Sequence, residues 1–371
     1  MIDRATSAIT LADLRRYAIA RSLFAPSGLQ RAIERLGFVQ ADPIRAPARA
    51  QDLALRHRVG DYHAGDLERR YPELPVEEDF FVNYGFVSRA VYALMHPRIV
   101  RPAWSATRRK RALAVLDFVR ERGEAHPRDV DAQFAHGAVT NAWGGSSNAT
   151  THLLDAMHYR GWLRVVRREA GIRIYGVRPD PAVDDVPSPR ARDDALVDVV
   201  VGKYAPLPAA RLGAVVRRLR YAAPQLAPGI DSALARAKRC LAHARVDGAD
   251  WYWPADETPR EFADALDGEV RFLAPFDPIV WDRARFEHFF GWAYRFEAYT
   301  PAQRRKLGYY ALPLLYGDAM IGWANVTVKD GALDADIGYV RGNAPRGPAF
   351  ARALDDEVAR MQTFLRARPA V

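Results

Sequence analysis

Cysteine is almost absent from the 371 residues. Cys240 stands alone, so no disulfide can form within the chain, and a reducing compartment is expected. Long apolar runs are missing as well, because none approaches the roughly 20 residues that a membrane-spanning helix needs. The first residues lack the apolar segment of a secretory signal peptide. We therefore expect a cytoplasmic protein that does not enter a membrane.

Motifs for metals and cofactors are also lacking. The nine histidines show no ligand spacing, and His152 and His158 fall on different faces of a predicted helix. The chain has no glycine-rich phosphate loop and no pattern typical of a serine–histidine–aspartate triad. The sequence therefore predicts a protein with no metal and no cofactor.

The chain has fewer acidic residues than basic ones. Lysine and arginine total 54 against 45 aspartates and glutamates, which leaves a formal net charge of +9. A basic surface favours an acidic partner, and nucleic acid is the commonest one. Hydrophobic residues make up 49% of the chain, which is enough for apolar cores of ordinary size. We expect folded domains with a nucleic-acid partner.

What the chain does contain is a recurring order of helices followed by short extended runs. In 107–180, three predicted helices precede a hairpin, which is the order of a winged helix. Similar units are predicted in 1–106, which includes an extended strand and a connecting segment, and in 190–256. Short β-prone runs and a final helix predict an antiparallel α+β domain over 268–371. The expected fold class is α+β, with about three tandem winged helices before the C-terminal α+β domain.

The hairpin of the second unit is rich in arginine. Six arginines between 160 and 178 accompany one acid, Glu169, and this density suits contact with phosphates. A turn and helix caps at 144–148 mark the next helix as the recognition helix. A solvated surface ribbon is the alternative interpretation of the charge. The residues predicted to contact DNA are Ser147, Asn148, Thr151, Arg164, Arg167, Arg168 and Arg173.

The extended run before Pro43 carries a candidate catalytic pair. Residues two apart on a strand point to the same face, so Gln40 and Asp42 are expected to project together. The Asp42 carboxylate could accept a proton from a water that Gln40 orients, or stabilise a cationic sugar as a base departs. Aspartate directly before proline also begins many turns, and this structural interpretation stays open.

Longer stretches of the chain resemble one family. The run Leu-Gly-Phe-Val-Gln-Ala-Asp-Pro at 36–43 is similar to a motif of the bacterial winged-helix DNA glycosylases of the AlkZ and YcaQ type. The likeness is strongest in Leu-Ala-Pro-Phe-Asp-Pro-Ile-Val-Trp-Asp-Arg at 273–283. Further matches lie in order along most of the chain, at 49–53, 161–163, 173–175, 289–291, 294–297 and 308–313.

The resemblance implies a monofunctional DNA glycosylase that hydrolyses the N-glycosidic bond of N7-alkylated purines and, in some members, unhooks interstrand crosslinks. It places Gln40 and Asp42 in the catalytic cleft, as the Gln-x-Asp motif of the YcaQ-like branch. An N7-alkylpurine is already cationic and leaves without a strong acid, so the enzyme must stabilise the sugar cation and deliver water. The implied partner is double-stranded DNA with alkylated bases, in the bacterial nucleoid.

One stretch departs from the family pattern. The family commonly carries a Trp-x-His element followed by Leu-Pro between its first two winged helices, whereas 80–88 reads Phe-Phe-Val-Asn-Tyr-Gly-Phe-Val-Ser. This departure keeps a second hypothesis open: a non-catalytic winged-helix protein, either a transcriptional regulator or a binder of damaged DNA. Regulators usually dimerise to bind paired half-sites. The chain has no long dimerisation helix, so a monomeric glycosylase is favoured.

Asp277, Trp281 and Arg283 lie in the run that most resembles the family. Two interpretations are open for them. They line the DNA channel, or a buried pair of an aspartate and an arginine fastens the C-terminal domain.

Overall fold

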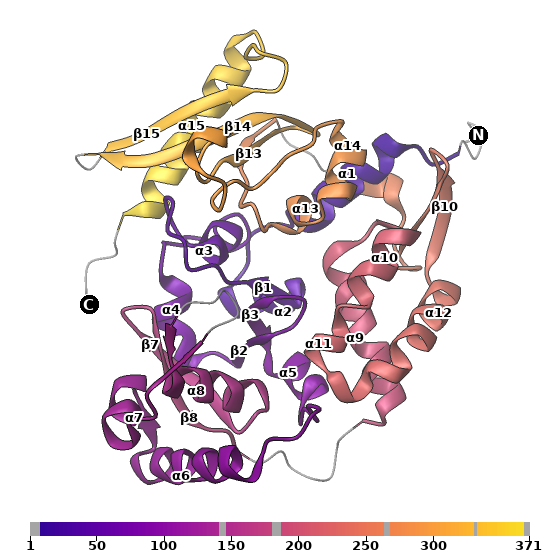
Figure 1. Cartoon of the computed structure of the whole chain (residues 1–371). Coiled ribbons are helices and arrows are strands. Elements are labelled where there is room, and N and C mark those ends of the chain that lie inside the picture. Colours follow the sequence, from indigo (N-terminus) through magenta and orange to yellow (C-terminus); the bar gives the residue numbers. More distant parts are fainter. Residues whose placement is uncertain (1–7, 141–145, 180–186, 263–267, 330–331, 367–371) are drawn as a thin grey trace.

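The computed structural model describes residues 8–140, 146–179, 187–262, 268–329 and 332–366. Within these ranges the chain forms a mixed α+β structure in which helices accompany three three-stranded sheets, a four-stranded sheet and a two-stranded sheet (Figure 1). None of the described helices combines the length and apolar character that a membrane span requires.

The first sheet contains the segment that carries Gln40. Its unit comprises α2 (Leu29–Leu36), β1 (Phe38–Gln40), α3 (Ala50–Leu55), α4 (Asp66–Arg70), the 3-10 helix η1 (Tyr71–Glu73), β2 (Val76–Phe80), β3 (Tyr84–Ser88) and α5 (Arg89–Met95). The strands are antiparallel in the order β1–β3–β2. A Cβ at Gly85 would lie 2.2 Å from the carbonyl oxygen of Val39, so β1 and β3 can approach this closely only because position 85 is glycine.

The second unit comprises α6 (Ala106–Arg122), β4 (Glu124–Ala125), α7 (Pro127–Phe134), β5 (Ala138–Thr140), β6 (Ser146–Asn148), α8 (Ala149–Tyr159), β7 (Leu163–Glu169) and β8 (Ile172–Val177). Its main sheet is ordered β4–β8–β7. Leu153, Leu154 and Met157 of α8 are buried, as their helical spacing predicts. The predicted turn at 144–148 falls partly outside the described residues, and its last residues pair with β5 as a short strand.

The third unit comprises α9 (Pro189–Tyr204), β9 (Leu207–Pro208), α10 (Ala209–Val216), α11 (Leu219–Ala222), the 3-10 helix η3 (Pro224–Gly229), α12 (Ile230–Cys240), β10 (Ala242–Val246), β11 (Ala249–Trp253) and the 3-10 helix η4 (Pro259–Phe262). Its sheet is ordered β10–β11–β9. Each unit therefore has a three-stranded sheet in which the strand that comes last in sequence lies between the other two.

The last part of the chain comprises β12 (Val270–Phe272), α13 (Pro278–Trp281), α14 (Arg283–Phe290), the 3-10 helix η5 (Ala302–Arg304), β13 (Leu312–Tyr316), β14 (Ala319–Lys329), β15 (Ala332–Tyr339) and α15 (Pro348–Leu365). The four strands form an antiparallel sheet in chain order. Glu357 of α15 is fully buried, and its carboxylate accepts a hydrogen bond of 2.7 Å from the backbone N–H of Phe272. This bond joins α15 to β12.

Helix α1 (Leu11–Ser22) lies apart from the unit that follows it in sequence. Thr10 and Asp13 form a capping box at its start. Its buried Leu14 and Tyr17 belong to an apolar core that the third unit shares with the first unit, and Ile19 packs with side chains of α13 and α14. Figure 1 shows α1 beside α13 and α14. The first helix thus ties the start of the chain to its second half.

Candidate active site

Gln40 is held in place by two donors. It is the last residue of β1, and its side-chain Oε1 accepts hydrogen bonds from Asn83 Nδ2 at 3.0 Å and Trp281 Nε1 at 2.9 Å. Asn83 lies in the turn between β2 and β3, and Trp281 ends α13. These two bonds occupy the carbonyl oxygen of the amide, so its N–H₂ group is the part left to donate to a ligand.

Asp42 follows the strand and lies in a turn. Its Oδ1 accepts a 2.8 Å bond from the backbone N–H of Ile44, and its own N–H donates to Gln51 Oε1 at 3.2 Å. The residue is only 8% exposed, and burial raises the pKa of its carboxyl group. No cation lies within ion-pair distance of it among the described residues. A buried carboxylate without a cation is costly, and such groups are found more often at functional sites than in packed cores.

The predicted geometry of this pair needs a correction. The sequence predicts that Gln40 and Asp42 project together from one strand, but the strand ends at Gln40, and only the N–H of Ala41 continues the pairing, to the Tyr84 carbonyl at 3.0 Å. Asp42 has already entered the turn before Pro43, as the alternative interpretation predicts. Gln40 therefore contacts Trp281 and Asn83, whereas Asp42 belongs to a cavity on the side of the second unit.

That cavity, of about 430 Å³, lies between the first and second units. Asp42, Arg49, Gln51 and Tyr84 line it from the first unit, and Thr151, Asp155, Arg168, Ile172, Arg173 and Tyr175 are among the residues that line it from the second. We call this cavity the interdomain groove. It brings Asp42 together with the helix and hairpin that the sequence predicts to contact DNA.

Two of the predicted wing arginines are bound to buried carboxylates of β2. Arg164 bonds to both oxygens of Glu77 at 2.8 and 3.0 Å, and Arg168 bonds to both oxygens of Glu78 at 2.7 Å. The Glu78 side chain is completely buried. These bidentate pairs fasten the β7–β8 hairpin to the first unit, so the six arginines are less free than their spacing indicates.

The other two wing arginines are more accessible. Arg167 pairs with Glu124 at 2.6 Å and with Glu169 at 3.2 Å, and all three side chains are exposed. Arg173 pairs with Asp155 at 2.6 Å and lies over the ring of Tyr84, 4.4 Å from its centroid. The exposed pairs of Arg167 exchange partners at little cost, whereas the Arg173 side chain is 30% exposed and is held by Asp155 and the ring of Tyr84.

The start of α8 has a capping role. Asn148 Oδ1 accepts from the N–H of Thr151 at 3.0 Å, and its Nδ2 donates to Asp131 at 2.9 Å. Ser147 belongs to β6, and its side chain lies outside the described part of the structure. Thr151 is exposed and lines the interdomain groove together with Asp42.

Asp277 and Arg283 do not pair with each other. Asp277 forms a bidentate pair with Arg58 at 2.8 and 3.1 Å, and both side chains are fully buried. Arg283 donates to the carbonyl of Val280 and lies over the ring of Tyr294. Of the three residues, Trp281 alone contacts the candidate catalytic pair.

Asn83 and Tyr84 were not identified from the sequence, although both belong to the stretch that departs from the family pattern. Asn83 bonds to Gln40, and Tyr84 lines the interdomain groove beneath Arg173. Asn83 and Tyr84 reach the site because β3 pairs with β1. Sequence analysis could have identified them only by predicting that pairing.

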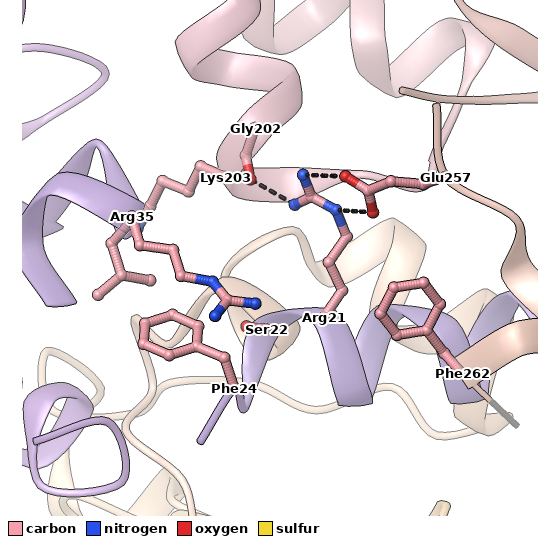
Figure 2. A pocket seen from close by; sticks show the side chains of 9 residues that line it. Arg21, Ser22, Phe24, Arg35, Gly202, Lys203, Glu257 and Phe262 are labelled. Atoms are coloured by element: carbon pink, nitrogen blue, oxygen red, sulfur yellow. Dashed lines mark hydrogen bonds and ion pairs between the residues drawn. The ribbon is translucent and has the colours of Figure 1, made fainter. Parts of the chain in front are cut away.

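A second cavity, of about 180 Å³, lies where the last turns of α1, α2 and α9 meet (Figure 2). Arg21 bonds to both oxygens of Glu257 and to the carbonyl of Gly202, and Lys203 donates to the carbonyl of Phe38 at the start of β1. Burial, together with the charge of Arg58, lowers the pKa of Lys203 to about 7. Cations at helix C-termini satisfy carbonyls there, so this cavity supports the fold.

Comparison with known proteins assigns the chain to a class of enzyme. Residues 33–364 match the family model described as DNA glycosylase AlkZ-like. Because the match spans most of the chain, the protein is a DNA glycosylase, a DNA-repair enzyme that acts on DNA. It belongs to the AlkZ-like family.

A solved structure has the same overall fold. Streptomyces sahachiroi DNA glycosylase AlkZ superposes with a TM-score of 0.63 over 98% of this chain and 100% of that chain, at 13% sequence identity. Identity this low establishes a shared fold and leaves the substrate to be argued from the site. Of the two functional hypotheses, family membership supports the enzyme over the non-catalytic binder.

Proposed function

We propose that this glycosylase hydrolyses the N-glycosidic bond of N7-alkylated purines, with Asp42 as the catalytic residue. The observation that carries the proposal is the Asp42 carboxylate: it is buried at the wall of the interdomain groove, with one backbone hydrogen bond and no cation among its described neighbours. Its negative charge is thus available to stabilise the oxocarbenium-like sugar that forms as the base leaves.

The residues at the groove support this substrate class, because the other carboxylate that lines it, Asp155, is paired with Arg173 and is not available as an acid. A neutral purine needs an acid to protonate it, and Asp42 cannot serve both as that acid and as the anion that stabilises the sugar. An N7-alkylpurine carries its positive charge before the bond breaks, so it needs no acid. No lysine lines the groove among the described residues, which favours water as the nucleophile and a monofunctional reaction.

Gln40 is assigned a positioning role. Its carbonyl oxygen is occupied by Trp281 and Asn83, which leaves the N–H₂ group to hold a water or a sugar oxygen near the end of β1. This division, with Asp42 supplying charge and Gln40 supplying orientation, keeps both residues in the reaction without requiring them to share one strand face.

We infer that DNA binds as a duplex along the interdomain groove. The repeated strand order supports three winged helices, within 1–106, 107–180 and 190–256, followed by the C-terminal domain at 268–371. Thr151 of α8 and Arg173 of the wing line the groove together with Asp42, which supports a role for both in phosphate contact. A monomer is sufficient for this arrangement. A groove that two units of the described structure line from opposite sides also fits unhooking of interstrand crosslinks.

The test is excision by Asp42→Asn. The amide keeps the shape of the side chain but cannot stabilise a cation, so single-turnover release of N7-methylguanine from duplex DNA should fall by about 100- to 1000-fold. Duplex affinity should not fall, because removing a negative charge cannot weaken binding to phosphates. Because burial raises the pKa of Asp42, excision by the parental enzyme should decline on acidification from a pH above the usual carboxyl range. Excision by Asp42→Asn at the parental rate would refute the assignment.

A further inference from the structure

The C-terminal domain carries a cluster of aromatic side chains that pack ring against ring. Phe296 is its centre: its ring centroid lies 5.1 Å from those of Phe276 and Tyr310 and 6.0 Å from that of Tyr299, in edge-to-face geometries. Such contacts fix the ring planes. We call Phe276, Phe296, Tyr299 and Tyr310 the aromatic cluster.

Tyr299 is the exposed member of the cluster. It is 77% accessible, the most exposed large hydrophobic side chain among the described residues, and Tyr309 beside it is 44% accessible. The pKa of the Tyr299 hydroxyl and that of the Tyr310 hydroxyl are both raised. Burial is the larger cause, and the negative charge of Asp42 is the second, so both hydroxyl groups lie within electrostatic range of that carboxylate. An exposed ring that packs on the half-buried Phe296, near a candidate catalytic carboxylate, is a ligand-binding feature.

Tyr310 gives independent support. Its side chain is 3% exposed, and its hydroxyl has no hydrogen-bond partner among the described residues. Buried hydroxyl groups are nearly always paired, so an unpaired one beside a functional carboxylate marks a place where a ligand or a bound water completes the site.

We propose that the ring of Tyr299, supported by Phe296, is the binding surface for the positively charged purine of the lesion. This inference rests on the proposed function. Alkylation at N7 gives the purine a formal positive charge, and a cation gains electrostatic attraction from the face of an electron-rich ring, whereas a neutral purine gains only stacking. The ring would therefore discriminate alkylated from normal purines before the bond breaks, and Asp42 would stabilise the charge that then moves to the sugar.

The geometry makes this role distinct from that of Asp42. Tyr299 supplies a neutral ring, so its effect falls on the difference in affinity between lesion and normal DNA. Phosphate contacts are the same for both duplexes and cancel in that ratio. The ratio of the two affinities is thus a readout that a purely structural Tyr299 would not change.

The experiment measures equilibrium binding of the full-length protein to two duplexes. One contains N7-methylguanine on a 2′-fluorinated sugar, which resists hydrolysis because fluorine destabilises the sugar cation, and the other contains guanine on the same sugar. Tyr299→Ala should lower the preference for the lesion by about 3- to 30-fold. Tyr299→Phe keeps the ring and should stay within about 2-fold of the parent. Tyr252→Ala, which removes a half-buried tyrosine of β11, is the matched control and should leave the preference unchanged.

Three results would overturn the inference: an unchanged preference in Tyr299→Ala, an equal loss in Tyr299→Phe, or a parent protein without any preference. Excision of N7-methylguanine from ordinary duplex DNA is measured in parallel. If the parent excises the base and Tyr299→Ala keeps the preference, the ring assignment fails and the proposed function stands. If the parent does not excise the base, the proposed function itself fails.

Discussion

Two buried ionisable residues lie at opposite ends of β1, and we assign one of them to catalysis and the other to stability. Asp42 follows the strand and keeps a carboxylate at the interdomain groove, while Lys203 donates to the carbonyl of Phe38, where the strand begins. Lys203 is almost completely buried, and Arg58 lies close enough to disfavour its charge. Lys203 thus holds the start of β1 against α9. We expect its protonation state to change the free energy of unfolding and not the rate of base excision.

Lys203 gives a prediction on the pH dependence of stability. Its pKa is lowered from an ordinary 10.5 to about 7 by burial, so between these values the unfolded chain binds more protons at this site than the folded protein does. The free energy of unfolding should therefore rise with pH across this window, by up to about 1.4 kcal/mol per pH unit from this group. Lys203→Met should lose that part of the slope, which urea unfolding at pH 7 and pH 9 measures.

The matched control is Lys110→Met, which removes an exposed lysine of α6. It should unfold with the parental pH dependence. If Lys203→Met and the parent gained the same free energy of unfolding between pH 7 and pH 9, the pKa of Lys203 would not be lowered by burial.

At the scale of elements, the β7–β8 hairpin forms arginine–glutamate pairs of two kinds, buried pairs with β2 and exposed pairs within its own unit. Arg168 reaches a Glu78 side chain with no exposed surface, while Arg167 pairs with exposed acids on its own unit. Removing one member of a buried pair leaves the other charge uncompensated, whereas an exposed pair is screened by water. The two arginines are adjacent in sequence but should behave differently.

We expect Arg168→Ala to lower the free energy of unfolding by about 3–5 kcal/mol, because Glu78 keeps its charge without its partner. Arg167→Ala should cost less than about 1 kcal/mol and serves as the control. Urea denaturation of the two variants at neutral pH separates these cases. Similar small losses in both would show that the hairpin docks on β2 without needing the pair.

Local patterns allowed the elements to be predicted better than their contacts. The helix stripe of α8 and the glycine turn of the β7–β8 hairpin are encoded in neighbouring residues, so periodicity and turn chemistry reveal them. The Arg168–Glu78 pair and the contact of Trp281 with Gln40 join residues far apart in sequence. A single sequence carries no signal for such pairs, so the wing arginines could be assigned to phosphates but not to Glu77 and Glu78.

At the scale of the whole molecule, one buried ion pair connects three regions. Arg58 bonds to Asp277 of the C-terminal domain, to the carbonyl and hydroxyl of Ser22 at the end of α1, and to the carbonyl of Ala54 in α3. Asp277 also accepts from the N–H of Ile279 at 3.1 Å and so caps α13, the helix that ends with Trp281. The pair therefore sets the position of the C-terminal domain relative to β1.

Asp277→Asn tests this connection. It leaves the Arg58 guanidinium buried with no negative charge at this position, so the free energy of unfolding should fall by about 3–5 kcal/mol. Asparagine can still cap α13, but the start of that helix is no longer held to Arg58 by the ion pair, so Trp281 should lose its alignment with Gln40. Single-turnover excision, measured at a temperature where unfolding curves show the variant fully folded, should then fall by more than the variant's loss of DNA affinity.

Trp281→Phe is the matched variant because it removes the indole N–H that bonds to Gln40 and keeps a smaller aromatic ring at this half-buried position. Its free energy of unfolding should fall by less than that of Asp277→Asn, because it loses one neutral hydrogen bond, worth about 0.5–1.5 kcal/mol, and part of the ring packing, while no buried charge is left uncompensated. If it lowers excision as much as Asp277→Asn does, the ion pair acts on catalysis through α13 and Gln40. If both variants excise at the parental rate while Asp277→Asn alone is destabilised, the pair holds the domains together without orienting the site. If Asp277→Asn were as stable as the parent, the carbonyl oxygens of Ser22 and Ala54 alone would be enough to stabilise the buried guanidinium of Arg58.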